Sequence, residues 1–347
     1  MVISPSFQIG SDQVGDGFPT YVIAEIGSNH NQSFDLACQS IEAAARGGAN
    51  AVKFQSFKAD SHYSKYSPGF SYLDNQSTYD LIKSLELNQA WHDDLATCAA
   101  DNGVTFFSSP CDIQSVENLS KLNTLAYKVA SFDLLDEQLV SHIASKGKPV
   151  ILSTGMADLG EIQFAINAVK AQRNHQIALL QCTSLYPAPV SLSNLKAMLT
   201  LQQAFGVVCG YSDHTLGTHI ALAAVARGAS IIEKHFTLDR SLPGPDHQFA
   251  IEPSEFKQMM IHIRDVEDSI GSGLKSGPRL QELEMAQKGR RSIHAMTSIQ
   301  EGQVITENMI CVKRPGLGIS PIHRKLVVGR KALTNIEPDQ WITWEMI

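Results

Sequence analysis

The chain has 347 residues, with 28 Lys or Arg and 35 Asp or Glu, so its formal net charge is −7. This acidic balance gives no general attraction to nucleic acid, although a local basic pocket could still hold an anion. No segment stays apolar for the roughly 20 residues that a membrane span requires, and residues 1–13 lack the basic and apolar regions of a secretory signal. We therefore expect a soluble cytoplasmic protein that binds neither nucleic acid nor membranes.

After an irregular start, short apolar runs alternate with helical patterns up to residue 270. Strands are expected at residues 21–26, 51–56, 104–108, 126–130, 149–152 and 177–181, and in runs ending at 210–215 and 231–237. Helices are expected from about 33 to 48, at 89–102, from 113, at 136–146, at 161–171, from 192, within 216–228 and at 253–270.

Eight strand-helix units within about 250 residues predict a (β/α)8 TIM barrel, an α/β fold. A doubly wound open sheet is the alternative, but it normally has a glycine-rich phosphate turn after its first strand, and residues 27–29 do not form one. The polar residues 58–80 are expected to form a loop over one end of the sheet.

Composition changes after residue 270, so we predict a barrel domain of residues 1–270, a linker of residues 271–289 and a small β-rich domain of residues 290–347. In this last domain, short β runs are expected at residues 292–296, 303–305, 310–312, 326–328 and 341–344. The six cysteines lack Cys-x-x-Cys spacing and are expected to be reduced.

His214 and His235 end two neighbouring strands that are joined by an Ala-rich helical segment. Parallel neighbours would place both imidazoles at one end of the sheet, where they could hold a metal ion, while a purely structural role is the alternative.

Polar residues also follow the other expected strands, and active sites of TIM barrels lie at these C-terminal ends. Two lysines and several serines there suit a ligand with phosphate and carboxylate groups, although a single serine is more often a turn or N-cap residue. The set comprises Glu25, Asn29, His30, Lys53, Gln55, Ser108, Ser109, Lys128, Ser131, Asp133, Ser153, Thr154, Ser184, Tyr186, Ser212, His214, Lys234 and His235. Glu25 is the candidate for proton transfer, with a lysine counter-ion or a substrate anchor as its alternative roles.

Several segments resemble motifs of the sialic acid synthase family, in order and over nearly the whole chain. They are AEIGSNHN (24–31), STGM (153–156), QCTSLYP (181–187), YSDHT (211–215), EKHFTLDR (233–240), LPGPDH (242–247) and VKRPG (312–316). The resemblance implies a TIM barrel with a C-terminal β-clip (antifreeze-like, SAF) domain. It also implies a domain-swapped homodimer that condenses phosphoenolpyruvate with an N-acylated hexosamine.

By position, the resemblance assigns a divalent ion, Mn²⁺ or Mg²⁺, to His214 and His235. It assigns phosphoenolpyruvate to Lys53, Ser109, Lys128, Ser131, Ser153, Ser184 and Ser212. It assigns the sugar to Gln55, Asp133, Tyr186 and Asp246, and the sugar's N-acyl group to Arg314 of the second subunit.

The exact sugar stays open. Phe132 in Ser131-Phe132-Asp133 resembles the pseudaminic branch, while Pro243-Gly244-Pro245-Asp246-His247 resembles the sialic and legionaminic branch. Other open functions are a different phosphoenolpyruvate–aldose synthase, a sugar-binding or ice-binding protein, and a Schiff-base aldolase that uses Lys128 or Lys234.

Overall fold

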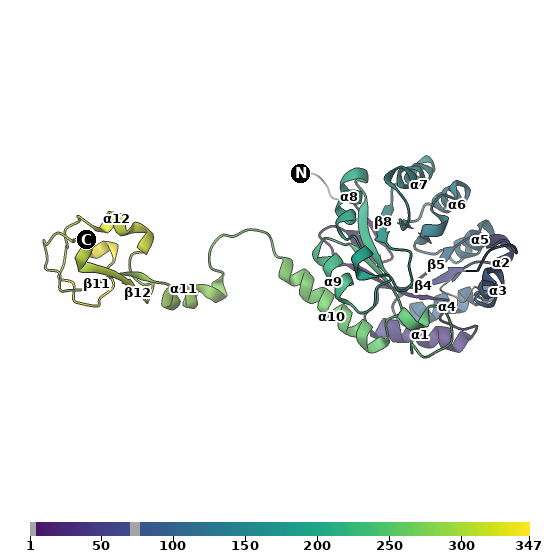
Figure 1. Cartoon of the computed structure of the whole chain (residues 1–347), viewed down its shortest axis with the longest axis horizontal. Helices are drawn as coiled ribbons and strands as arrows, with labels where there is room; N and C mark the ends of the chain where they lie inside the picture. The colour runs from purple at the N-terminus through teal and green to yellow at the C-terminus, as the bar shows by residue number, and fades with distance from the viewer. Residues whose placement is uncertain (1–4, 70–76) are drawn as a thin grey trace. The chain divides into compact units, whose positions relative to one another are not determined.

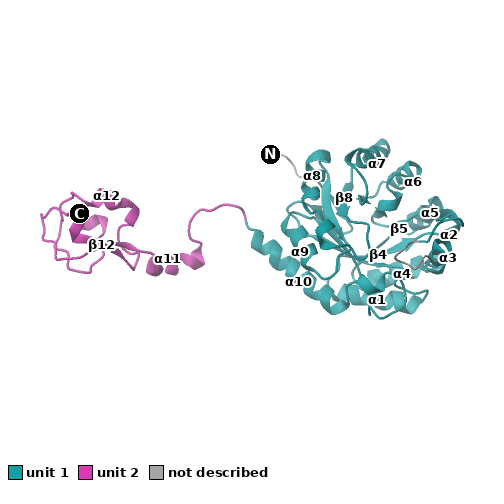
Figure 2. Cartoon of the chain, viewed as in Figure 1, with its two compact units in different colours: residues 1–271 teal, residues 272–347 magenta. Residues whose placement is uncertain are grey.

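The computed structural model describes residues 5–69 and 77–347. The chain forms two compact units, Met1–Gly271 and Ser272–Ile347, which are described separately below (Figure 2). Within the described ranges, no helix is long and apolar enough to cross a membrane. All six cysteines are free thiols, as expected.

Unit 1 is built around an eight-stranded parallel sheet (Figure 1). The strand order is β5-β4-β3-β10-β9-β8-β7-β6, and the two end strands contact each other, so the sheet curls into a nearly closed barrel. The predicted TIM barrel is confirmed, and the open doubly wound sheet is wrong. The strands are β3 (Tyr21–Gly27), β4 (Ala51–Ser56), β5 (Thr105–Pro110), β6 (Tyr127–Val129), β7 (Val150–Ser153), β8 (Ile177–Cys182), β9 (Val208–Asp213) and β10 (Ile231–His235).

A helix follows each barrel strand in the chain, and local signals mark several helix ends. Asp158 and Glu161 form a capping box at the start of α7, and Gly206 ends α8 in the left-handed conformation, which glycine adopts without steric cost. The helices are α1 (Phe34–Arg46), α4 (His92–Asp101), α5 (Ile113–Lys121), α6 (Glu137–Ala144), α7 (Leu159–Ala171), α8 (Lys196–Phe205), α9 (His219–Ala226) and α10 (Pro253–Ile270).

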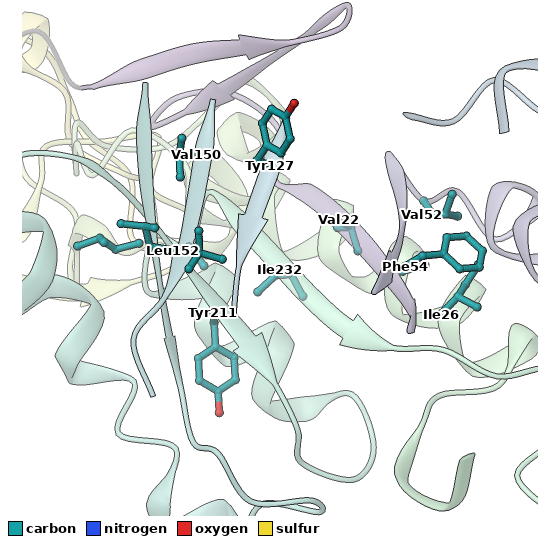
Figure 3. Close-up of a cluster of buried hydrophobic side chains, with 14 of the residues drawn as sticks. Val22, Ile26, Val52, Phe54, Tyr127, Val150, Leu152, Tyr211 and Ile232 are labelled. Carbon is teal, nitrogen blue, oxygen red and sulfur yellow. The ribbon is translucent and has the colours of Figure 1, made fainter. Parts of the chain in front are cut away.

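Alternate residues of each strand enter two different hydrophobic clusters. In β3, Val22 packs against the surrounding helices, whereas Ile23 lies in the smaller cluster inside the barrel. Figure 3 shows part of the outer cluster, including Val52 and Ile232. The inner cluster contains residues from the N-terminal halves of the strands, so the other inward positions, near the C-terminal ends, are left for polar side chains.

The start of the chain, expected to be irregular, forms an antiparallel hairpin of β1 (Ser6–Ile9) and β2 (Asp12–Gly15). Gly10 has φ +60°, as the first turn residue of a two-residue hairpin can require. Phe7, Ile9 and Val14 join the inner cluster, and the hairpin therefore closes the N-terminal end of the barrel.

The segment of residues 58–80 is not a simple loop, because it contains α2 (Ala59–His62) and the start of α3 (Thr78–Ser84). Residues 70–76 of the expected loop lie outside the described residues. Glu86 fixes the start of α2 by accepting hydrogen bonds from the Lys58 side chain and the Ala59 backbone, both at 2.8 Å.

Unit 2 contains α11 (Leu283–Gly289), β11 (Ser292–Ala295), β12 (Ile310–Lys313) and α12 (Arg324–Val327). The strands and α12 contribute residues to an isoleucine-rich core, whereas α11 has no buried residue. The expected β runs at residues 303–305 and 341–344 contribute single bridges, Val304 to Lys331 and Trp341 to His294. The expected run at 326–328 is wrong: this segment continues a 3-10 turn that begins at Pro321 and becomes α12.

Candidate active site

A cavity of about 660 Å³ lies at the C-terminal ends of the barrel strands. Each of the eight barrel strands, or the turn that follows it, contributes polar residues to its wall. Glu25 and all the residues of unit 1 that the resemblance assigns to a ligand line this cavity: Glu25, Lys53, Gln55, Ser109, Lys128, Ser131, Asp133, Ser153, Ser184, Tyr186, Ser212, His214, His235 and Asp246. Of the other strand-end residues, Asn29, His30 and Thr154 do not line it; Asn29 Nδ2 donates to the carbonyl of Phe236 and Thr154 Oγ1 to that of Leu180. Arg314, the remaining predicted residue, lies in unit 2, where its Nε donates to the carbonyl of Gly289 at 2.7 Å.

Strand alternation decides which polar residues reach the cavity. Lys53 and Gln55 share a face of β4 and point inward, as expected. Lys234 lies on the other face of its strand from His235 and does not line the cavity. Its Nζ donates to Asp213 Oδ2 and to the carbonyl of Thr215, each at 2.8 Å. The grouping of Lys234 with the site was therefore wrong, and so was that of Ser108, whose hydroxyl bonds to Ser56.

Glu233, which the sequence analysis did not select, is part of the site. It has the same strand parity as His235, and this spacing of two residues was the signal that could have revealed it. Its carboxylate lies 3.5 Å from Lys53 Nζ and 3.8 Å from Lys128 Nζ, and it accepts a hydrogen bond from Ser212 Oγ at 3.0 Å. Glu233 therefore connects the two lysines.

Glu25 lies on the other side of Lys53, with its Oε2 2.8 Å from Nζ, and accepts a hydrogen bond from Gln55 Nε2 at 2.8 Å. Burial raises the pKa of Glu25 to about 7, against the opposing effect of Lys53. Burial also opposes ionisation of Glu233, but Lys128 and Lys53 outweigh it and hold the pKa of Glu233 below its usual value. Such a separation of pKa values is typical of catalytic carboxylates with different roles.

Several hydroxyl groups surround the lysines. Ser109 Oγ lies 3.1 Å from Lys53 Nζ, and the hydroxyls of Ser153 and Ser184 are buried without a hydrogen-bond partner among the described residues. Buried polar groups are nearly always hydrogen-bonded, so unpaired hydroxyls beside ammonium groups indicate a place where ligand oxygens bind.

Gly155 allows two of these serines to approach the backbone. Its N–H donates to Ser131 Oγ at 3.0 Å. A Cβ on Gly155 would lie 2.3 Å from Ser184 Oγ and 2.9 Å from Ser131 Oγ, which is closer than atoms can pack. The glycine is therefore required by the close packing of the serine cluster.

The imidazoles of His214 and His235 lie next to each other, with ring centroids 5.4 Å apart. His214 Nδ1 is 2.8 Å from the carbonyl of Thr183, so it carries the proton and Nε2 keeps its lone pair. The buried Nδ1 of His235 has no hydrogen-bond partner in the described part of the chain, and Asp246 Oδ2 lies 3.7 Å away.

These imidazoles fit a divalent cation. Burial lowers the pKa of both rings, well below the usual value for His235, and neutral imidazole is the form that binds metal. His235 Nδ1 has no hydrogen-bond partner among the described residues, so its lone pair or proton is not committed to another protein group. Two imidazole ligands with Asp246 nearby leave positions for water or substrate, as a catalytic cation requires.

Together, these features define a TIM-barrel enzyme whose cavity has lysines and hydroxyls suited to an anion beside a pair of imidazoles suited to a cation. The family model for the NeuB family matches residues 40–275, and that for the SAF domain matches residues 290–347. The chain therefore belongs to the NeuB family of sialic acid synthases, and its C-terminal segment is a SAF domain.

Two curated relatives are similar over almost the whole chain. An uncharacterised protein of Methanocaldococcus jannaschii is 41% identical over 97% of each chain. The N,N'-diacetyllegionaminic acid synthase of Legionella pneumophila is 40% identical over 96% of each chain. Among solved structures, N-acetylneuraminic acid synthetase of Leptospira borgpetersenii, crystallised with citrate, matches with a TM-score of 0.74 and 33% identity, over 81% of this chain and 95% of that one.

Proposed function

We propose that this enzyme condenses phosphoenolpyruvate with an N-acylated hexosamine, such as N-acetylmannosamine, to give a nine-carbon 2-keto-3-deoxy acid and phosphate. The observation that carries this proposal is the arrangement of Lys53 and Lys128, with the serines, beside the two neutral imidazoles in one cavity. Such a site can hold a phosphorylated carboxylic acid next to an activated carbonyl group.

The lysines and serines would bind phosphoenolpyruvate. Charge-assisted hydrogen bonds from ammonium groups to phosphate and carboxylate oxygens are the strong ones, and the hydroxyls of Ser109, Ser153 and Ser184 supply further donors. Glu233 would keep the two lysines oriented, because its carboxylate lies within 4 Å of both.

Gln55, Asp133, Tyr186 and Asp246 would contact the sugar. His214 and His235 would hold Mn²⁺ or Mg²⁺, and the chemistry supplied by such a cation is Lewis-acid polarisation of the aldehyde oxygen of the open-chain sugar. Tyr186 packs its ring against His214, with centroids 4.4 Å apart, and would fix that imidazole beside the sugar.

In the reaction, C3 of phosphoenolpyruvate attacks the aldehyde carbon, a C–C bond forms, the aldehyde oxygen takes up a proton, and positive charge develops at C2. Water adds at C2 and gives its proton to the carboxylate of Glu25. The C–O bond between C2 and the phosphate of the resulting hemiketal then breaks, so phosphate leaves with the bridging oxygen. The hemiketal hydroxyl gives its proton to solvent and becomes the 2-keto group. Glu25 is suited to this transfer because its pKa of about 7 lies near neutral pH.

A direct test mixes the purified protein with Mn²⁺, N-acetylmannosamine and phosphoenolpyruvate labelled with ¹⁸O in the bridging position. We expect phosphate release that requires the sugar, a product mass equal to the condensed acid, and the label in phosphate. Pyruvate formation with borohydride trapping at Lys128 would instead indicate a Schiff-base aldolase. Absence of phosphate release with all N-acylated hexosamines would contradict the proposal.

A second candidate substrate is a 2,4-diacetamido-trideoxyhexose, the substrate type of the legionaminic and pseudaminic branches. Apolar side chains are also among the residues that line the cavity, including Phe57 and Phe132. These would favour a methyl group over a hydroxymethyl group, because a buried hydroxyl needs a hydrogen-bond partner. Measuring kcat/KM for N-acetylmannosamine and for a 2,4-diacetamido-trideoxyhexose would decide between the candidates, because the preferred substrate has the higher value.

We also propose that the enzyme works in the cytoplasm as a domain-swapped homodimer, in which Arg314 of one subunit reaches the sugar in the other barrel. The free cysteines are consistent with a reducing compartment. The planar guanidinium on a long side chain suits recognition of an acyl oxygen.

A further inference from the structure

A second set of side chains of metal-binding types lies in the same cavity. The proposed reaction gives these three residues no joint role. His62 is the last residue of α2, Cys111 directly follows β5, and Asp133 lies in the 3-10 turn after β6. All three line the cavity and are partly buried. We refer to them as the His62–Cys111–Asp133 cluster.

The strand order places this cluster across the barrel from the imidazole pair. β5 and β6 are the two ends of the sheet that meet where the barrel closes, whereas β9 and β10, which carry His214 and His235, lie in its middle. The cluster and the imidazole pair are therefore separate groups of ligands on opposite walls of one cavity.

The geometry of the cluster is that of a closely spaced ligand set. One nitrogen, one sulfur and one oxygen atom all lie within 4.8 Å of one another, and His62 Nδ1 is 4.0 Å from Asp133 Oδ1. Bond lengths of about 2.0–2.3 Å in a tetrahedral zinc site separate ligand atoms by about 3.3–3.8 Å, so small side-chain rotations are enough to bring the three atoms to one ion.

Neighbouring groups hold these side chains in place. The thiol of Cys111 donates to the carbonyl of Ser109 at 3.9 Å. The ring of His62 stacks on Phe57, with centroids 6.0 Å apart, and meets Tyr63 edge-on at 4.8 Å. Fixed ligands favour metal binding, because less conformational entropy is lost when the ion arrives.

We propose that His62, Cys111 and Asp133 bind Zn²⁺, and that the bound ion excludes the sugar from the cavity. A thiolate selects Zn²⁺ over Mn²⁺ and Mg²⁺, and one thiolate with one carboxylate balances the charge of the ion. As the Zn–S bond forms, the thiol proton passes to solvent. The second part of the proposal rests on the proposed function, because it requires Asp133 to contact the sugar.

Cobalt is a suitable probe for the binding part, since Co²⁺ bound to thiolate gives a charge-transfer band in the near ultraviolet. We expect this band when Co²⁺ is added to the wild-type protein, and its loss in Cys111→Ser. Cys98→Ser is the matched control, because Cys98 lies on α4 and does not line the cavity, and it should keep the band. A band that persists in Cys111→Ser, or is missing from the wild type, would overturn the site.

Inhibition tests the second part. With saturating Mn²⁺, added Zn²⁺ should raise the KM for the sugar and leave that for phosphoenolpyruvate unchanged, in the wild type and in Cys98→Ser. Loss of a direct ligand should weaken binding at least as much as loss of an outer-sphere partner, which costs 10–100-fold, so Cys111→Ser should need about a hundredfold more Zn²⁺. Equal inhibition of Cys98→Ser and Cys111→Ser by Zn²⁺, or competition of Zn²⁺ with phosphoenolpyruvate, would contradict exclusion of the sugar. The cobalt spectrum needs no turnover and therefore tests the site even if no sugar is condensed.

Discussion

Glu25 and Glu233 are two buried carboxylates that approach the same ammonium group, yet their pKa values move in opposite directions. Glu25 has one close lysine, whereas Glu233 lies between two and accepts a hydrogen bond from Ser212. Burial raises the pKa of Glu25, whereas Lys128 and Lys53 lower the pKa of Glu233. Glu233 therefore stays ionised while Glu25 can exchange a proton near neutral pH.

This difference predicts the pH dependence of the reaction. Only ionised Glu25 can accept a proton, and its pKa in the free enzyme is about 7. The value of kcat/KM should therefore fall about tenfold per pH unit below pH 7. Glu25→Gln should remove this limb and lower kcat by about 10²–10⁴-fold, whereas Glu284→Gln, at an exposed position, should preserve the profile. A limb that persists in Glu25→Gln would assign the titration to another group.

Gly155→Ala should damage phosphoenolpyruvate binding. The new Cβ would displace Ser184 and Ser131, so we expect a raised KM for phosphoenolpyruvate and a loss of about 1–3 kcal/mol in the free energy of unfolding from overpacking. Gly289→Ala is the control, since its Cβ would be 3.8 Å from the nearest neighbour. Steady-state kinetics and urea unfolding measure the two effects, and unchanged values would show that the serine cluster adapts.

The positions of most cavity residues could be predicted from the sequence, because strand alternation and the C-terminal ends of barrel strands place them together. Within β10, Glu233 shares its strand face with His235 and lines the cavity, whereas Lys234 lies on the opposite face. A motif read as a continuous run does not show which of two adjacent charged residues faces inward, so both faces of the strand have to be considered separately.

At the scale of elements, β10 carries charged residues on both faces, each with its own partners. The outward Lys234 forms a buried ion pair with Asp213 on β9, at 2.8 Å. This pair connects two neighbouring strands behind the imidazoles. It therefore supports the site from outside the cavity.

Removing one member of that pair should destabilise the barrel. Lys234→Met leaves the Asp213 carboxylate buried without its cation, and we expect a loss of about 3–5 kcal/mol in the free energy of unfolding. The exposed pair of Lys288 and Glu284 gives a matched control, in which Lys288→Met should cost less than about 1 kcal/mol. Urea denaturation measures both, and similar losses would contradict this role of the Lys234 pair.

Long periodic elements were easier to predict than short ones. The eight barrel strands and their helices follow clear apolar patterns, and the barrel was predicted from them. The hairpin of β1 and β2 has four residues per strand, and α2 and α12 have four each, too few for periodicity to identify. In Arg324–Val327, the adjacent apolar residues Leu326 and Val327 are compatible with a strand or a helix. The helix continues the 3-10 turn that begins at Pro321.

At the scale of the whole molecule, the proposed domain swap makes a prediction about mixed subunits. His214→Ala should inactivate its own barrel but still supply Arg314, whereas Arg314→Ala should keep its barrel intact. Mixed dimers would then contain one complete site, so unfolding and refolding equal amounts together should recover about a quarter of wild-type activity. At a sugar concentration well below the KM of Arg314→Ala, each variant refolded alone should stay nearly inactive. Failure of the mixture to recover would place Arg314 with its own barrel or outside the site.

Arg314→Ala by itself distinguishes the two substrates. Loss of a contact to the acyl group should raise the KM for the sugar far more than that for phosphoenolpyruvate. Equal effects on the two KM values would remove Arg314 from sugar recognition.

The hairpin that closes the N-terminal end of the barrel also affects the order in which substrates bind and products leave. Because Phe7, Ile9 and Val14 fill that end, both reactants and both products have to pass through the opening at the C-terminal ends of the strands. Phosphoenolpyruvate bound to the buried lysines would then be covered by the sugar that binds after it. We therefore expect phosphoenolpyruvate to enter first and the sugar second, a sequence that product-inhibition patterns would reveal.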